Sequence, residues 1–295
     1  MADIELRFHH DMLVLSSPLN EHMRRQGFSE ADGLELLCVT EEEAVEEALR
    51  LEMLAGAQCL VTPTAGITEA RLAHQRLESN AKEVLEAAMS VTKRFKPQHV
   101  IAEIESTGLP IDPDSKSSLM ANRDQYSQAA KLFEEEQVDA FLLNNLYSLS
   151  DLRCALMGVR RVSDRPIMAS VKTDAQGMLL GRNQSIEDAV AVMVEYEANV
   201  VGVTVKADLE DACALVRRMA AVCSLPLLVQ LEVNPETSKL PKHTHEDPYW
   251  SADTMVQALL QLRAAGAQFV RAVGKATPSY TGALATTAMG LSCIR

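Results

Sequence analysis

Eight short runs of apolar, largely β-branched residues recur along the chain at fairly even spacing, and turn or charged residues bound each run. Runs of this kind, separated by helical segments, are typical of strands that are buried on both faces of a sheet. We therefore expect eight buried strands. They cover residues 12–16, 58–62, 99–104, 138–143, 166–171, 199–205, 226–231 and 268–273.

Longer segments rich in Ala, Leu, Glu and Arg lie between these runs and show helical spacing. The expected helices cover residues 41–54, 68–94, 120–136, 149–159, 185–196, 209–222, 251–265 and 278–291. The step from helix to strand even repeats in sequence, because Ala-Gly-Ala-Gln occurs at residues 55–58 and again at 265–268. A small residue there closes the helix before the chain turns into a buried strand.

Eight helix-and-strand units of this kind predict a parallel sheet closed into a (β/α)8 TIM barrel. The alternative is an open, doubly wound sheet, which is disfavoured because no Gly-x-Gly-x-x-Gly follows any expected strand. The chain has 295 residues, of which 47% are hydrophobic, and this is ample for one core. With no linker in sight, we predict a single domain over residues 1–295.

The composition narrows the classes of partner. Lys and Arg total 28 against 41 Asp and Glu, which gives a net charge of -13 without a basic tract, so we expect neither a nucleic-acid nor a membrane partner. The longest apolar runs have the length of strands, and the N-terminus lacks the pattern of a signal peptide. The six cysteines are scattered without a C-x-x-C, which is typical of reduced thiols in a cytoplasmic protein.

Several segments carry a family resemblance in their order and spacing. Pro166-Ile-Met-Ala-Ser-Val171 is followed by Asp174-Ala-Gln-Gly177 and by Leu179-Leu-Gly181, and the last strand ends in Gly274-Lys-Ala-Thr-Pro278. These segments resemble the fifth strand, the Asp-x-x-Gly loop and the tail signature of the homocysteine S-methyltransferase family. The resemblance extends from the first strand to the eighth. It implies the barrel of that family and a methyltransferase that acts on a small thiol or methyl-donor substrate, as in methionine metabolism.

The resemblance also implies a change at the metal site. In the family, three cysteines hold a zinc ion that activates the homocysteine thiol. At the matching positions this sequence has Val205, Val273 and Gly274, and valine cannot bind zinc. Family acidic residues at the ends of the second and fourth strands correspond to Val61 and Asn144. We therefore expect the family zinc to be absent, and we predict no cofactor.

Three residues are candidates for catalysis, because barrel sites lie at the carboxyl ends of the strands. Lys206 ends the sixth strand and could act as a Schiff-base nucleophile, or it could pair with Asp208. Glu103 and Glu105 alternate at the end of the third strand, so both face either the lumen or the helices. In the lumen they could hold an amine or exchange protons; otherwise Glu105 caps a loop and Glu103 pairs with a lysine.

Further polar residues at the strand ends are candidates for binding substrate. The predicted set is Thr62, Asn144, Asp174, Gln230, Glu232 and Lys275. Hydrogen bonding within the barrel rim and exposure in solvated loops are the alternatives for these residues. A weaker metal alternative is His243 with His245, which lie in the long loop after the seventh strand and have carboxylates beside them.

Three functions follow from these observations. By resemblance, the chain is a methyltransferase with its zinc-thiolate site lost. The alternatives are a non-catalytic or repurposed barrel that binds a small molecule or a corrinoid methyl-transfer partner, and a Schiff-base lyase that uses Lys206. In each case we expect a small-molecule ligand at the C-terminal mouth of the barrel. A corrinoid-protein partner and a homo-oligomer are both compatible with the acidic composition.

Overall fold

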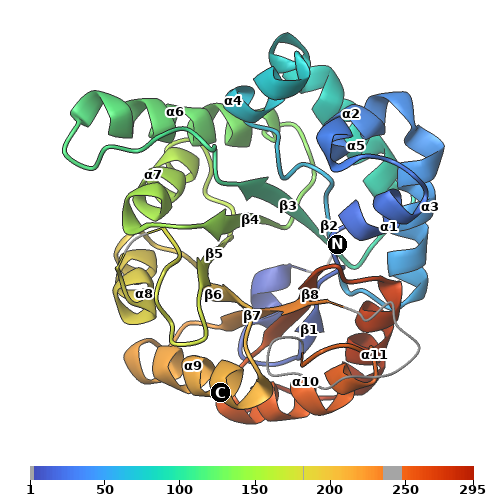
Figure 1. The fold of residues 1–295 in the computed structure, drawn as a ribbon, viewed down its shortest axis with the longest axis vertical. Helices are drawn as coiled ribbons and strands as arrows, with labels where there is room; N and C mark the ends of the chain where they lie inside the picture. The colour runs from blue at the N-terminus through green and yellow to red at the C-terminus, as the bar shows by residue number, and fades with distance from the viewer. Residues whose placement is uncertain (1–2, 182, 235–247) are drawn as a thin grey trace.

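The computed structural model describes residues 3–181, 183–234 and 248–295, and within them eight parallel strands form one sheet. Their order is β1-β8-β7-β6-β5-β4-β3-β2, and a bridge between Leu15 and Cys59 joins β1 to β2 and closes the ring (Figure 1). The predicted (β/α)8 barrel is confirmed. The strands are β1 Leu13–Val14, β2 Cys59–Val61, β3 His99–Glu105, β4 Ala140–Leu146, β5 Ile167–Thr173, β6 Val200–Val205, β7 Leu227–Val233 and β8 Phe269–Gly274.

Each strand is followed by a helix that packs on the outside of the ring (Figure 1). These helices are α3 Glu42–Leu54, α5 Ala81–Lys93, α6 Lys116–Leu132, α7 Leu149–Arg160, α8 Ile186–Glu195, α9 Leu209–Val222, α10 Thr254–Ala265 and α11 Pro278–Ala288. Several begin at the caps that their sequence offers: the Ser148 and Asp208 side chains accept from backbone N–H groups in the first turns of α7 and α9. Among the helices of the described residues, none combines the length and apolar character that crossing a membrane requires.

Two of the predicted connections are wrong. The helix expected over residues 68–94 is divided into α4 Glu69–Leu72, two 3-10 turns and α5, because Arg76 adopts a left-handed conformation with φ 60° that interrupts the helix. The connection after β1 contains two unexpected helices, α1 Asn20–Arg25 and α2 Leu34–Thr40. Both connections border the mouth of the barrel.

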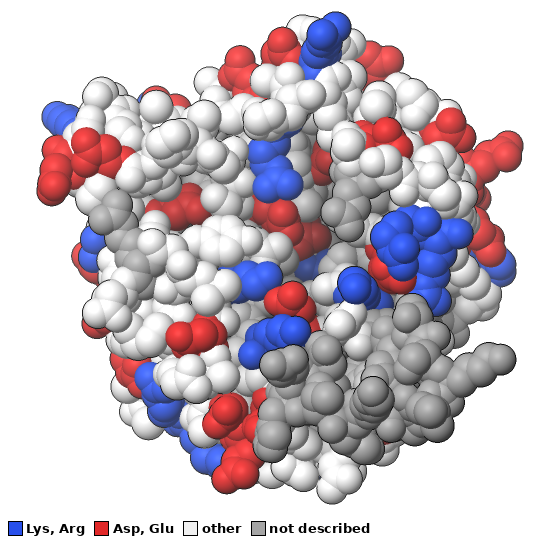
Figure 2. Space-filling model, in the orientation of Figure 1, with Lys and Arg blue, Asp and Glu red and all other residues white. Residues whose placement is uncertain are grey.

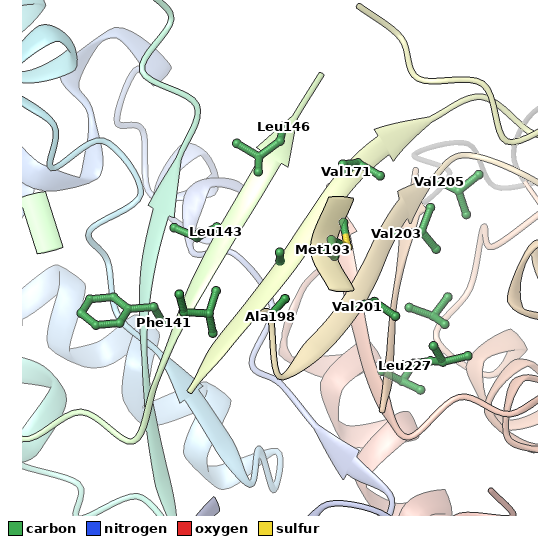
Figure 3. Packing of buried hydrophobic residues seen from close by; sticks show 14 of the residues in the cluster. Phe141, Leu143, Leu146, Val171, Met193, Ala198, Val201, Val203, Val205 and Leu227 are labelled. Atoms are coloured by element: carbon green, nitrogen blue, oxygen red, sulfur yellow. The ribbon is translucent and has the colours of Figure 1, made fainter. Parts of the chain in front are cut away.

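The apolar core has two layers because side chains alternate along each strand. The outer layer lies between the sheet and the helices. In Figure 3 it includes Val201, Val203 and Val205 along β6, with Leu227 beside Val201. The inner layer fills the N-terminal half of the lumen with residues such as Ile101, Leu142 and Phe269. Towards the C-terminal ends of the strands, the inward-facing residues become polar, and this change positions the site.

Candidate functional site

A buried ion pair forms the floor of the site. Arg271 of β8 donates from Nη1 to Oε1 of Glu103 at 2.7 Å and from Nη2 to Oε2 at 3.2 Å, and the two residues are only 1% and 6% exposed. The Nε of Arg271 also donates to the carbonyl of Ser16 at 2.8 Å. This two-point geometry holds both carboxylate oxygens of Glu103. The partner of Glu103 is thus an arginine, not the lysine considered from the sequence.

A network of amides and hydroxyls completes the floor. Asn144 donates to Oε1 of Glu103 at 2.6 Å, and Nε2 of Gln230 lies 2.7 Å from Oδ1 of Asn144. The same Gln230 nitrogen lies 2.9 Å from the hydroxyls of Ser170 and Thr204. Gln230 is fully buried beneath the site and orients the residues above it. A buried network with these partners satisfied is rigid.

A cavity of about 560 Å³ opens above this floor at the carboxyl ends of the strands. It has the size of a small-molecule site. Figure 2 shows that both basic and acidic side chains lie in the hollow at the centre of this face. The charged side chains that line the cavity are Glu35, Arg71, Glu103, Glu105, Lys172, Glu232 and Arg271.

Two consecutive asparagines on β4 both line the cavity, although strict alternation would send one of them outward. The register between β4 and β5 shifts between Leu143 and Leu146, and Asn145 has a φ of 51°. This bulge turns Asn145 inward beside Asn144. Its Nδ2 donates to Oε1 of Glu105.

Glu105 differs from Glu103 in how firmly it is held. The nearest cation is Arg71, whose Nη1 lies 3.5 Å from Oε2 of Glu105, and the Glu105 side chain is 20% exposed. Burial raises the pKa of Glu105 to about 7, and the negative charge of Glu103 adds to this effect. A carboxyl group with this pKa exchanges a proton near neutral pH.

A third carboxyl group comes from the unexpected helix α2. Glu35 is 6% exposed and accepts a hydrogen bond from the backbone N–H of Gly66. Burial raises the pKa of Glu35. A Cβ on Gly66 would lie 3.0 Å from the Glu35 carboxyl group, so the glycine leaves room for it.

A further ion pair lies on the other side of the mouth. The Nζ of Lys172 on β5 lies 3.0 Å from Oε2 of Glu232 on β7, and both side chains are partly exposed. The strand order places β7 opposite β3 in the ring. The cavity therefore has one carboxylate and one cationic side chain on each of two facing walls.

The structure brings together most of the predicted site residues. Glu103, Glu105, Thr62, Asn144 and Glu232 line the cavity, and Gln230 lies directly below it. The other three described candidates, Lys206, Asp174 and Lys275, are outside its lining. Lys206 and Lys275 are exposed, and Asp174 accepts from the backbone N–H groups of Gln176 and Met178 in its own loop. His243 and His245 lie outside the described residues.

Arg271, Arg71 and Glu35 line the cavity but were not predicted from the sequence. Only Arg271 carried a recognisable signal, because it is a single charge inside an otherwise apolar strand. Arg71 and Glu35 sit on short helices whose place beside the mouth depends on the tertiary fold.

The residues that the resemblance matches to the zinc cysteines, Val205, Val273 and Gly274, have no side chain that could form a zinc-thiolate site. Val273 and Gly274 border the cavity, whereas Val205 is buried in the outer layer. Gly274 has a φ of 72°, and a Cβ there would lie 3.0 Å from the Val233 carbonyl oxygen. All six cysteines are free, and none lines the cavity. The described residues contain no cluster of three or more His, Cys, Asp or Glu side chains suited to a metal.

Comparisons with known proteins agree with this barrel. A family model described as homocysteine S-methyltransferase matches residues 12–287. The crystal structures of the metallated and the oxidized form of the homocysteine methyltransferase MmuM from Escherichia coli each superpose with a TM-score of 0.74 at 18% identity, covering 94% of this chain and 96% of that chain. The carboxyl transferase domain of Rhizobium etli pyruvate carboxylase has a TM-score of 0.52 at 11% identity, over 97% of this chain and 48% of that chain. At such identities these structures show the shared fold alone. None of the curated proteins compared with the chain matches it significantly in sequence.

Proposed function

The chain belongs to the homocysteine S-methyltransferase family, and from that premise we propose that it transfers a methyl group to a small, amino-acid-like thiol without a zinc-bound thiolate. The acceptor lies in the cavity at the mouth of the barrel. The observation that carries the proposal is Glu105, a carboxyl group in the cavity lining that the Asn145 amide and Arg71 contact and whose pKa burial raises to about 7.

The charges of the cavity support a zwitterionic ligand. Arg71 with Glu105 on one wall, and Lys172 with Glu232 on the facing wall, offer both signs of charge at partly exposed positions. An α-ammonium group pairs with a carboxylate, and an α-carboxylate pairs with arginine or lysine. Arg271 and Glu103 hold each other below and stay out of this exchange.

Glu105 supplies the proton acceptor. The acceptor thiol gives its proton to the Glu105 carboxylate, and the resulting thiolate takes the methyl group from a donor, which leaves with the electron pair of the broken bond. At neutral pH a carboxylate with a pKa near 7 is a better base than an ordinary glutamate, and the loss of such a base costs about 10²–10⁴-fold in rate. No metal takes part in this sequence of steps.

A barrel that binds the same ligands without methyl transfer is the second candidate. It is favoured by the absence of cysteine ligands from the cavity lining, since a thiol is then activated only by a carboxylate. The Schiff-base lyase has less support, because Lys206 lies outside that lining.

The test is a methyl-transfer assay on untagged, chelator-washed protein with L-homocysteine as the acceptor. The donors are S-methylmethionine, S-adenosylmethionine and methylcobalamin, the last as a stand-in for a corrinoid partner. The matched variants are Glu105→Gln and Glu86→Gln, since Glu86 is an exposed carboxylate on the outer helix α5. We expect turnover in the presence of chelator that falls at least about 100-fold in E105Q and stays unchanged in E86Q.

Two results would overturn the proposal. One is turnover that appears only after zinc is restored. The other is an absence of turnover with every donor. In that second case, calorimetric binding of L-homocysteine that is weakened by E105Q favours the non-catalytic barrel.

A further inference from the structure

The two glutamates of β3 are held in parallel ways by neighbouring elements. Glu103 lies between Arg271 and Asn144, and Glu105 lies between Arg71 and Asn145. The second arrangement exists only because β4 bulges, since a regular strand would point Asn145 away from the lumen. The bulge therefore shifts the register of the sheet and also brings an amide donor into the cavity.

Asn145 is one of few residue types that fit this bulge. Its φ of 51° is left-handed, a region that Asn tolerates better than other residues with a Cβ. Glycine would adopt the same backbone conformation but has no amide to donate. Aspartate would adopt it too, but it would place a second negative charge against Glu105.

We propose that Asn145 is a positioning residue, whose left-handed backbone conformation turns its side-chain amide onto Oε1 of Glu105 and fixes the direction in which that carboxylate faces the cavity. The proposal rests on the proposed function, in which Glu105 accepts the proton. Strained, non-glycine backbone at a site of this kind is characteristic of residues whose geometry serves the chemistry.

Several other charged or titratable groups face Glu105 and also affect its pKa. Glu103 comes from the same strand, Arg71 from α4 and Glu35 from α2. Burial and the two carboxyl groups favour the protonated form of Glu105, whereas Arg71 and the Asn145 amide favour its ionised form. Removal of the amide alone therefore shifts the protonation of Glu105 in a known direction.

The experiment is a ligand-free pH titration of the Glu105 carboxyl carbon by ¹³C NMR, assigned with Glu105→Gln. Asn145→Gly keeps the left-handed backbone and deletes the amide, and Asn80→Gly, which deletes an exposed amide outside the cavity, is the control. We expect N145G to raise the Glu105 midpoint by about one pH unit. N80G should leave it unchanged. The acidic limb of the pH profile in the methyl-transfer assay, where the rate rises as Glu105 ionises, should shift with the midpoint.

A second variant guards against failure of N145G to fold. Asn145→Asp keeps the shape and the backbone preference, and its charge should raise the Glu105 midpoint further than the glycine does. A folded N145G or N145D with an unshifted midpoint would overturn the positioning role. Because the titration uses no substrate, a failure of methyl transfer leaves this result intact, and the two proposals fail separately.

Discussion

Arg271 and Glu103 form a two-point ion pair inside the barrel, with Nη1 2.7 Å from Oε1 and Nη2 3.2 Å from Oε2. The pair comes from β8 and β3 and lies where the apolar lumen gives way to the cavity. In this pair the cation and the anion, which are 1% and 6% exposed, bind each other. Ligand contacts are thereby left to the more exposed pairs above it.

Removal of Arg271 should destabilise the protein strongly. Arg271→Met leaves Glu103 buried without its cation, and breaking a buried pair in this way costs about 3–5 kcal/mol. The double variant with Glu103→Gln removes the orphaned charge and should recover part of the loss. Urea unfolding of both variants measures the two values. A loss below about 1 kcal/mol in the single variant would show that the pair is not buried as described.

The stability of the protein should depend on pH through Glu105. Its folded pKa of about 7 lies above the ordinary value of 4.5, so between these values the folded state binds more protons than the unfolded state, and stability falls as pH rises. Glu105→Gln has no such proton to lose. Its stability relative to the natural protein should therefore rise by roughly 2 kcal/mol from pH 5 to pH 8. Urea unfolding at the two pH values checks this, and an unchanged difference would refute the shifted pKa.

Val273 and Gly274, the two β8 residues that the resemblance matches to zinc cysteines, should differ in their tolerance of cysteine. Gly274→Cys forces a side chain into a left-handed backbone against the Val233 carbonyl and should cost about 1–3 kcal/mol. Val273→Cys should cost less than about 1.5 kcal/mol, because it replaces one buried side chain with another of smaller size. Thermal unfolding compares them, and an equal loss would be inconsistent with the backbone at Gly274.

Ligand binding should depend on the wall formed by Lys172 and Glu232. Glu232→Gln removes one charge of the pair that lies 3.0 Å apart on the side facing Glu105. We expect the affinity for L-methionine, an unreactive amino-acid probe, to fall about tenfold by calorimetry, which corresponds to about 1.4 kcal/mol. The exposed Glu86→Gln serves as the comparison. Unaltered affinity in E232Q would remove this wall from the binding site.

The barrel could be predicted from the sequence because a strand that is buried on both faces is a short run of apolar, largely β-branched residues. The eight runs between 12–16 and 268–273 each overlap a strand of the structure. The helix expected over 68–94 was wrong because the apolar periodicity continues across Arg76, where the backbone turns left-handed. Periodicity reports which residues are apolar and does not report a local break in the backbone.

The candidate site could be predicted only in part. Glu103, Glu105, Asn144 and Glu232 were found because polar residues at the ends of barrel strands meet at one mouth. Glu35 could not be found, because the path of the connection after β1 decides where α2 lies. Asn145 could not be assigned either, since one extra residue in a bulge reverses the face that alternation predicts.

The zinc content of the purified, untagged protein, measured by elemental analysis after incubation with Zn²⁺ and desalting, tests the central claim most directly. The account predicts far less than one zinc ion per chain, because the cavity of the described residues has no cysteine and no cluster of metal ligands. Near-stoichiometric zinc would contradict it. His243 and His245 would then be the first residues to replace, because they are the alternative metal ligands in the sequence. Both lie outside the described residues.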